Sequence, residues 1–358
     1  MEAVAFYENL RRRRANGQTD LSGADDAIPE ELASDAATGA GYHRLGPGGD
    51  AGGAWGKPPL RVVTVAELLG MELPPRQYAL APVLPLPGLA MLYAPRGMGK
   101  TYLALSLALA IGSGAPVLKW AAPAPRRVLY VDGEMPVVAL QERVARLIRA
   151  APTLLQEDCL RFLCADLQPD GLLSIARPPG QAKIEEAMDD ADVLILDNLS
   201  TLADGLRENE ADDWGPLQRW LLALRRAGKT VLLIHHAGKG GQQRGTSRRE
   251  DALDTVIALR RPADYEPEQG ARFEVCLEKA RGVVGPDAAP FEAKLVEDAE
   301  GGLAWAWADL ADAKEDRAAD LLRNGLSIRD VADATGLSKS AVGRLKQRLD
   351  QERGHGRT

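Results

Sequence analysis

A run of small and basic residues near position 97 has the spacing of a phosphate-binding loop. Residues 94–101 read Ala-Pro-Arg-Gly-Met-Gly-Lys-Thr, which matches the pattern G-x-x-x-x-G-K-[ST] except that Ala94 replaces the first glycine. Gly97 and Gly99 can adopt the positive φ angles that a tight loop needs. Lys100 would then reach the β- and γ-phosphates of ATP, and Thr101 would coordinate Mg²⁺. The residues expected to contact the nucleotide are Ala94, Pro95, Arg96, Gly97, Met98, Gly99, Lys100 and Thr101.

Two acidic residues stand where a hydrolytic site would need them, each at the end of an apolar run. Asp197 follows Val193–Leu196, which predicts a carboxylate at the carboxyl end of a buried strand, where it would hold a Mg²⁺-bound water. Asn198 comes next, so the base that activates water is expected on Glu134, with Asp132 as the alternative. Both acids also fit local roles, Asp197 in capping a turn and Glu134 at a helix N-terminus.

These residues lie between short apolar runs and helix-length segments that alternate along the chain. Runs rich in Val, Ile and Leu predict strands that are buried on both faces. They are Leu89–Ala94, Val128–Asp132, Val193–Asp197 and Val231–His235. The helical segments are Lys100–Gly112, Val137–Ala150, Ala182–Asp190 and Trp214–Ala227. This alternation predicts an α/β fold, with a mostly parallel sheet and helices on both of its faces.

Four later apolar runs follow one another without helices between them. They are Thr255–Arg260, Phe273–Lys279, Phe291–Val296 and Leu303–Trp307. Strands joined by short connections pair antiparallel, so we expect an antiparallel extension at one edge of the sheet.

Taken together, these motifs resemble the RecA-like ATPases and, within them, the plasmid replicative helicase RepA family, a group of AAA family ATPases. Three further segments carry the resemblance, which spans about residues 60–307. They are Thr230–Gly241, similar to the strand and loop that sense the γ-phosphate; Gln243–Ser247 with Asp251–Asp254, similar to an Arg-Gly-Ser-Ser segment; and Leu277–Gly282, similar to the Lys-x-Arg hairpin of ring helicases. The resemblance implies a RecA-like P-loop NTPase core.

The same resemblance implies a ring, expected to be a hexamer, with ATP at the boundaries between subunits. Arg244 then matches the arginine finger that reaches a neighbour's γ-phosphate and stabilises charge in the transition state. His236 matches the histidine that senses the γ-phosphate. Lys279 and Arg281 are candidates for a further contact with the neighbour's nucleotide. Apart from the resemblance, simpler roles also fit these residues. Arg244, Lys279 and Arg281 could be exposed charges, and His236 could be a hydrogen-bonded residue at a strand end.

Two segments after neighbouring strands would line a nucleic-acid path in a RecA-like protein. Asn198–Asp213 is acidic and is a poor match for DNA phosphates. Ala237–Arg249 combines glycines with basic residues, which suits contacts to the backbone of single-stranded DNA. The residues expected to make those contacts are Lys239, Arg248 and Arg249.

The C-terminal part of the chain has a helix–turn–helix pattern that resembles those of resolvases and transcription regulators. Gly336 follows the small residue Ala332 by four positions and predicts the turn, and Ser338 can cap the second helix. That helix is basic until Asp350. The residues expected to contact duplex DNA are Lys339, Ser340 and Arg344. A helical hairpin that docks on another protein is the alternative.

Changes in composition divide the chain into five parts. Residues 1–58 contain much glycine and little apolar sequence, so we expect a disordered tail. Residues 59–309 are the expected ATPase domain, and residues 310–316 are a charged connector. Residues 317–350 are the expected helix–turn–helix module, and residues 351–358 are a second tail.

The overall composition fits a globular protein. The 358 residues include 44 Lys+Arg and 51 Asp+Glu, for a net charge of −7, which argues against a protein that coats nucleic acid. Residues 78–95 and 101–118 are uncharged over a membrane-spanning length. The first stretch is rich in proline and the second begins in the phosphate-binding loop, so we expect no membrane span and a cytoplasmic protein. Three cysteines predict neither a disulfide framework nor a zinc site.

The leading interpretation is an ATP-hydrolysing motor on DNA. The resemblance favours a ring-forming replicative helicase that acts for a plasmid, phage or mobile element. The expected partners are single-stranded DNA through the ring, duplex DNA at the helix–turn–helix and further copies of the chain, with a primase or initiator as a candidate. Two alternatives stay open: a RecA-like recombination or repair ATPase, and an ATP-gated DNA-binding regulator without unwinding activity.

Overall fold

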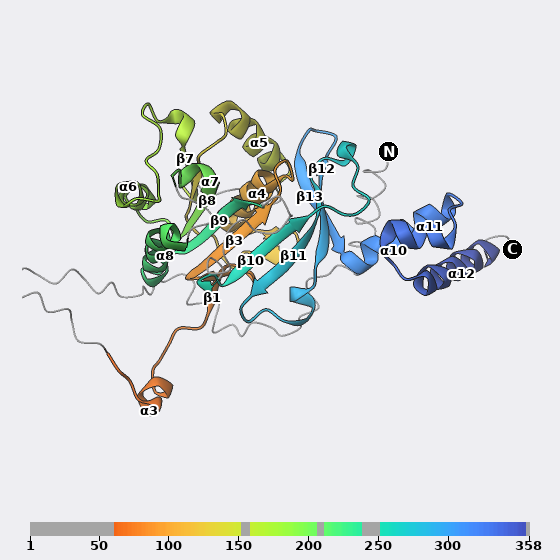
Figure 1. Ribbon diagram of the computed structural model, residues 1–358, viewed down its shortest axis with the longest axis horizontal. Helices are drawn as coiled ribbons and strands as arrows, with labels where there is room; N and C mark the ends of the chain where they lie inside the picture. Colours follow the sequence, from red (N-terminus) through yellow and green to blue (C-terminus); the bar gives the residue numbers. More distant parts are fainter. Residues whose placement is uncertain (1–60, 152–157, 206–210, 238–250, 356–358) are drawn as a thin grey trace, which may run out of the picture.

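The computed structural model describes residues 61–151, 158–205, 211–237 and 251–355. Within these residues, nine strands form one sheet with helices on both faces, and three helices follow the sheet at the C-terminal end (Figure 1). The order of strands across the sheet is β13-β12-β11-β10-β3-β9-β8-β6-β7. The predicted α/β fold class is confirmed.

Six neighbouring strands of this sheet run parallel, from β10 across to β7. Their bounds are β3 (Gly88–Ala94), β6 (Val128–Asp132), β7 (Leu160–Cys164), β8 (Val193–Asp197), β9 (Thr230–His236) and β10 (Thr255–Arg260). Every residue of β3, β6, β8 and β9 is buried, as expected for strands covered on both faces. Because these strands are parallel, their carboxyl ends meet at one edge of the sheet.

Helices cover both faces of the parallel strands. On one face lie α4 (Lys100–Ser113) and α5 (Val137–Arg149), and on the other lie α6 (Pro178–Met188), α7 (Leu199–Leu202) and α8 (Ala211–Arg226). Ala90 and Leu92 of β3 pack in the first core, whereas Leu89 and Met91 pack in the second. Successive side chains of a strand point to opposite faces, so one short apolar run supports both layers.

The antiparallel extension consists of β11 (Arg272–Ala280), β12 (Phe291–Glu297) and β13 (Leu303–Asp309). The expectation is confirmed for these three strands. Residues 255–260 form β10, which pairs antiparallel with β11 as expected and also pairs in parallel with β3, a pairing that the sequence did not indicate. A parallel strand must start at the same end of the sheet as its neighbour, and the connection between β9 and β10 is long enough to return the chain from the carboxyl end of β9 to that end. β7 was not expected, and its residues are mostly half-buried, as on an edge strand.

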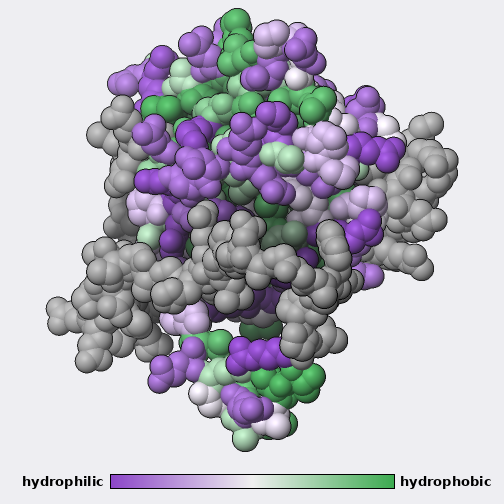
Figure 2. Space-filling view, turned by 90° about the vertical axis from the view of Figure 1, so that its left-hand side faces the viewer, coloured by the Kyte–Doolittle hydropathy of each residue, from purple (hydrophilic) through white to green (hydrophobic). Residues whose placement is uncertain are grey.

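Smaller elements surround this sheet. They are the hairpin of β1 (Gln77–Leu80) and β2 (Leu84–Leu86), the hairpin of β4 (Pro116–Val117) and β5 (Trp120–Ala121), and the short turns η3 (Ala165–Leu167), η4 (Pro267–Gln269) and η5 (Gly285–Ala288). α3 (Val65–Leu69) stands away from the sheet and has no buried residue (Figures 1 and 2). In the part of the chain that the structure describes, no helix has the length and apolarity needed to cross a bilayer.

The C-terminal helices are α10 (Leu310–Arg323), α11 (Ile328–Thr335) and α12 (Lys339–His355). We call them the three-helix unit, and they share a small core that includes Ala318, Val331 and Val342. α10 begins directly after β13, so residues 310–316, expected as a connector, form the first half of a helix. Residues 351–355, expected as part of a tail, continue α12. Residues 310–316 are rich in good helix formers, and packing of α10 and α12 on the shared core supports the helices that contain both segments.

Candidate functional site

The phosphate-binding loop connects β3 to α4 at the carboxyl edge of the sheet. Gly97 and Gly99 have φ angles of 74° and 94°, in a region that residues other than glycine rarely adopt. A Cβ atom on Gly99 would lie 2.7 Å from the Cβ of Ala271, so a larger residue does not fit without a shift of the backbone. The two glycines therefore allow the tight turn that the motif predicts.

The other residues of this loop differ in exposure. Pro95 and Arg96 are exposed, whereas Met98 is buried in the core beside α4. Met98 can thus offer a phosphate only its backbone N–H. Ala94 is fully buried, and its carbonyl accepts a hydrogen bond from the backbone N–H of Ala237 at 2.9 Å. Alanine fits this place because Ala94 is the last residue of a strand and needs no unusual backbone conformation.

Lys100 is the first residue of α4, and its side chain folds back over the loop. Its Nζ donates to the carbonyl of Ala94 at 3.0 Å and to that of Pro95 at 2.8 Å. Burial lowers the pKa of Lys100 to about 8, and the charges of Asp197 and Glu134 oppose this shift. An ammonium group held over a loop of this shape is placed to exchange carbonyl oxygens for phosphate oxygens.

Asp197 ends β8 and is buried beside Thr101. The hydroxyl of Tyr130 donates to its Oδ2 at 2.6 Å. Burial raises the pKa of Asp197 to about 6, although hydrogen bonds with Tyr130 and Thr101 lower it. A hydroxyl and a carboxylate oxygen are hard ligands of the kind that Mg²⁺ prefers, and a cation would favour the charged form that burial disfavours. The residues present therefore fit the predicted metal.

Glu134 lies next to Asp197 because the ends of β6 and β8 are aligned. Asp132 and Asp197 are register partners, and the N–H of Gly133 donates to the carbonyl of Asp197 at 2.8 Å. The amide nitrogen of Asn198 donates to Oε2 of Glu134, and Nε2 of His236 lies 3.9 Å from the same oxygen. The structure thus brings together Glu134 and His236, two of the predicted catalytic residues, from separate strand ends.

Asp132, the alternative base, is engaged with the backbone. Its Oδ1 accepts from the N–H of Glu134 at 3.1 Å and from that of Met135 at 2.7 Å. Burial raises its pKa, and these two hydrogen bonds oppose that shift. Asp132 therefore shapes the turn that carries Glu134, whose side chain is 60% exposed and open to water.

A comparison with family models identifies this nucleotide-binding architecture. A model described as an AAA domain matches residues 57–242, more than half of the chain. The chain belongs to this AAA domain family. It therefore contains a P-loop ATPase domain, as the sequence motifs predicted.

Three solved structures are similar to the chain. The flagellar accessory protein FlaH from Methanocaldococcus jannaschii is 16% identical, with a TM-score of 0.43, over 63% of this chain and 91% of that one. The RadB recombinase is 16% identical, with a TM-score of 0.42, over 61% and 90%. The KaiC-like protein PH0186 from Pyrococcus horikoshii OT3 is 16% identical, with a TM-score of 0.43, over 62% and 90%. A comparison with curated proteins found no match.

Two predicted nucleotide contacts lie at the opposite edge of the sheet, beyond the residues that the AAA domain model matches. Lys279 of β11 pairs with Val256, near the amino end of β10. Arg281 donates to the carbonyl of Asp251 at 2.9 Å and lies 3.8 Å from the carboxylate of Asp254. The structure therefore does not bring these two cations to the phosphate-binding loop of their own chain.

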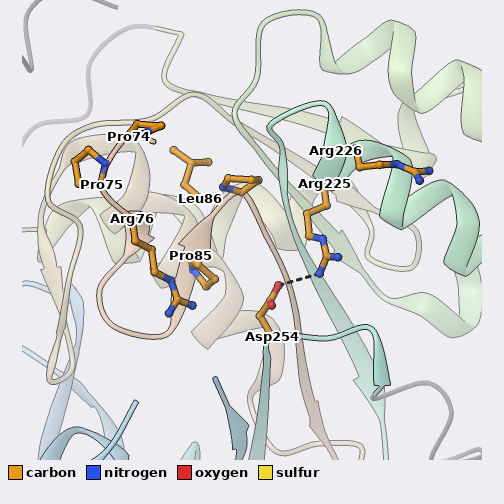
Figure 3. Close-up of a pocket in the computed structure, with 9 residues that line it drawn as sticks. Pro74, Pro75, Arg76, Pro85, Leu86, Arg225, Arg226 and Asp254 are labelled. Atoms are coloured by element: carbon orange, nitrogen blue, oxygen red, sulfur yellow. Dashed lines mark ion pairs between the residues drawn. The ribbon is translucent and has the colours of Figure 1, made fainter. Parts of the chain in front are cut away.

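A pocket of about 480 Å³ also lies at this opposite edge (Figure 3). Its walls are formed by Pro74, Pro75, Arg76, Pro85, Leu86, Pro87, Arg225, Arg226 and Asp254. Arg225 forms an ion pair with Asp254 at 3.6 Å. The phosphate-binding loop contributes nothing to these walls, so this pocket is not the nucleotide site of the AAA domain.

The predicted contacts with single-stranded DNA fall outside the described residues. They are Lys239, Arg248 and Arg249, and the predicted arginine finger Arg244 lies in the same segment. On α12, the side chains of Lys339, Ser340 and Arg344 are exposed. The hydroxyl of Ser338 accepts from the N–H of Ala341 at 3.2 Å, and Gly336 has a φ of 69°. The predicted cap and turn are therefore present.

Two residues of the site were not predicted from the sequence. Tyr130 was assigned only to a buried strand, yet a buried tyrosine hydroxyl needs a partner, and Asp197 is that partner. Asn198 was noted only because it is not an acid. Its Oδ1 caps α7 by accepting a hydrogen bond from the backbone N–H of Thr201 at 3.2 Å. Its amide nitrogen is then available to donate to Glu134. Only the alignment of β6 with β8 shows that the two side chains meet.

Proposed function

We propose that this protein hydrolyses ATP with Mg²⁺ at the carboxyl edge of its sheet. The observation that supports this most directly is the meeting of Lys100, Asp197 and Glu134 around the phosphate-binding loop. Lys100 binds the β- and γ-phosphates, and Thr101 and Asp197 hold the metal. When bound, Mg²⁺ neutralises charge on the phosphates.

Glu134 is the proposed base in this reaction. Its carboxylate accepts a proton from the attacking water, while the Asn198 amide fixes the direction of one of its oxygens. His236 lies beside the same carboxylate, at the end of the strand that neighbours the phosphate-binding loop. It is therefore placed to respond when a γ-phosphate occupies the loop.

The deciding experiment is ATP turnover by the purified full chain, with and without single-stranded DNA. We expect turnover that requires Mg²⁺ and that rises when DNA is added. Light scattering on the same material gives the assembly that carries the activity. Failure to bind labelled ATP in the presence of Mg²⁺ would overturn the proposal.

The finer form of the proposal is a DNA motor that assembles as a ring. The exposed basic residues of α12 support contact with duplex DNA. Lys279 and Arg281 lie away from the nucleotide of their own chain, which is compatible with contacts to the nucleotide of a neighbour. Together with Arg244, these residues favour the replicative helicase of a plasmid, phage or mobile element. The candidate partners are DNA, other subunits and a primase or initiator.

The two alternative functions keep the ATPase site but differ in assembly. A recombination or repair ATPase would form filaments on single strands, which electron microscopy distinguishes from closed rings. An ATP-gated regulator would bind duplex DNA tightly and hydrolyse ATP slowly, without stimulation by single strands. A strand-displacement assay on a forked substrate tests the helicase activity itself.

A further inference from the structure

A buried cluster of charged side chains joins α10 to the connection between β10 and β11. Nε and Nη2 of Arg272 donate to the two carboxylate oxygens of Glu292 at 2.7 and 2.8 Å. Nη1 of Arg272 donates to Asp264 at 2.6 Å. Arg317 of α10 forms an ion pair with the same Asp264. Two arginines thus meet two carboxylates, and all four side chains are largely buried.

The same connection supports the phosphate-binding loop. Nη2 of Arg261 donates to the carbonyl of Gly97 at 2.9 Å. Nη1 of Arg261 donates to the carbonyl of Arg272 at 3.0 Å, at the other end of the connection. The Cβ of Ala271, also in this connection, lies 2.7 Å from the place that a Cβ on Gly99 would take. The position of residues 261–271 therefore affects both glycines of the loop.

α10 also carries the rest of the three-helix unit. Glu315 forms an ion pair with Arg348 of α12, whereas Arg317 faces Asp264. Residues two apart on a helix point to different sides, so α10 contacts α12 on one side and the connection between β10 and β11 on the other. A continuous set of contacts thus runs from the helix with exposed basic residues to the phosphate-binding loop.

We propose that the contact between Arg317 and Asp264 couples the position of the three-helix unit to the affinity of the phosphate-binding loop for nucleotide. If Arg317 moves away, a buried carboxylate loses one of its two cations, which is costly. The connection between β10 and β11 then shifts, and the hydrogen bond from Arg261 to the carbonyl of Gly97 is weakened. Arg261 and Arg317 act here as positioning residues. The inference rests on the nucleotide site proposed above. Coupling of binding is reciprocal, so DNA on α12 and nucleotide in the loop affect each other's affinity.

The test compares Arg317→Gln with Arg323→Gln in the full chain. Both changes remove one arginine from α10, but Arg323 pairs with Asp320 of its own helix. We measure the Kd for a fluorescent ADP analogue with Mg²⁺, and the KM and kcat for ATP. We expect Arg317→Gln and Arg261→Gln to weaken nucleotide binding by about fivefold or more. KM should rise while kcat changes by less than about twofold, because Glu134 is untouched.

A double-mutant cycle between Arg317→Gln and Asp264→Asn checks that the two residues act together. Each single change already breaks the contact between Arg317 and Asp264. We therefore expect the Kd of the double variant to be no higher than that of the single variant with the higher Kd. Arg317→Lys keeps the positive charge and should recover part of the affinity for nucleotide. If Arg317→Gln unfolds the helices, the comparison of Arg317→Lys with the wild type tests the inference in its place. Equal Kd values for wild type, Arg317→Lys and Arg317→Gln, or independent effects in the cycle, would overturn the inference. Failure of the wild type to bind nucleotide would instead overturn the proposed function.

Discussion

At the scale of single residues, the site depends on ionisable groups that are buried close to one another. Lys100 and Asp197 are both buried, and burial moves each pKa toward neutrality. A triphosphate and its metal would restore the charged forms of both side chains. The site is therefore suited to bind a group that carries negative charge together with a divalent cation.

Glu134→Gln tests the proposed base. Glutamine keeps the shape of the side chain but cannot accept a proton, so turnover should fall by about 10²–10⁴-fold while ATP binding is retained. Steady-state ATP hydrolysis and equilibrium binding of labelled ATP measure the two effects. Glu142→Gln on the exposed side of α5 is the matched control and should behave as wild type. Unchanged turnover in Glu134→Gln would remove Glu134 from the mechanism.

The pH dependence of nucleotide binding tests Lys100 and Asp197 together. Below pH about 6, Asp197 becomes protonated and loses its attraction for Mg²⁺; above pH about 8, Lys100 becomes neutral. Affinity for Mg-ATP should therefore be highest between these values and fall on both sides. Because Tyr130 lowers the pKa of Asp197, Tyr130→Phe should move the acidic limb to higher pH. An acidic limb that does not move would contradict this assignment.

At the scale of elements, the phosphate-binding loop is shaped by strand ends and by a connection from another part of the sheet. Gly99 lies against Ala271, in the connection that follows β10. β10 is adjacent to β3 although the two strands are more than 150 residues apart in the chain. The loop is thus held by tertiary packing as well as by its own sequence.

Substitution of the two loop glycines separates backbone strain from steric conflict. Gly97→Ala and Gly99→Ala both place a side chain at positive φ, at a cost of about 1 kcal/mol or more. Gly99→Ala also meets Ala271 at 2.7 Å, whereas a Cβ on Gly97 meets nothing within 4 Å. We expect Gly99→Ala to lose nucleotide affinity by about tenfold or more and Gly97→Ala to lose less. Calorimetric binding of Mg-ATP measures the difference, and equal losses would argue against the contact with Ala271.

At the scale of the whole molecule, hydrolysis is expected to need more than one subunit. Arg244→Ala subunits keep the proposed base but lack the proposed finger, and Glu134→Gln subunits keep the proposed finger but lack the proposed base. If the finger acts on a neighbour, an active interface needs an intact base from one subunit and an intact finger from the next. In an equal mixture each occurs with a probability of one half, so about a quarter of the interfaces contain both. Mixing the two inactive proteins should then restore ATP turnover. Activity that stays absent after mixing and reassembly would argue against a finger at a subunit interface.

Much of the fold follows from local sequence, because a fully buried strand needs a continuous apolar run and a phosphate loop needs glycines at set positions. β6 and β8 have the bounds expected from their apolar residues. β10 also has its expected bounds, but its parallel pairing with β3 was not predicted. Apolar patterning specifies that a segment is a strand, but the pairing partner depends on where a long connection returns the chain.

The sequence by itself determined the phosphate-binding loop, the strand that ends in Asp197 and the turn at Gly336, because each depends on residues that are near one another in the chain. Only the tertiary structure decided that Asn198 meets Glu134, that Tyr130 meets Asp197 and that Arg317 meets Asp264. Such contacts join strands and helices that are distant in sequence. Their geometry is set by sheet register and by the need to pair buried polar groups, which no local pattern records.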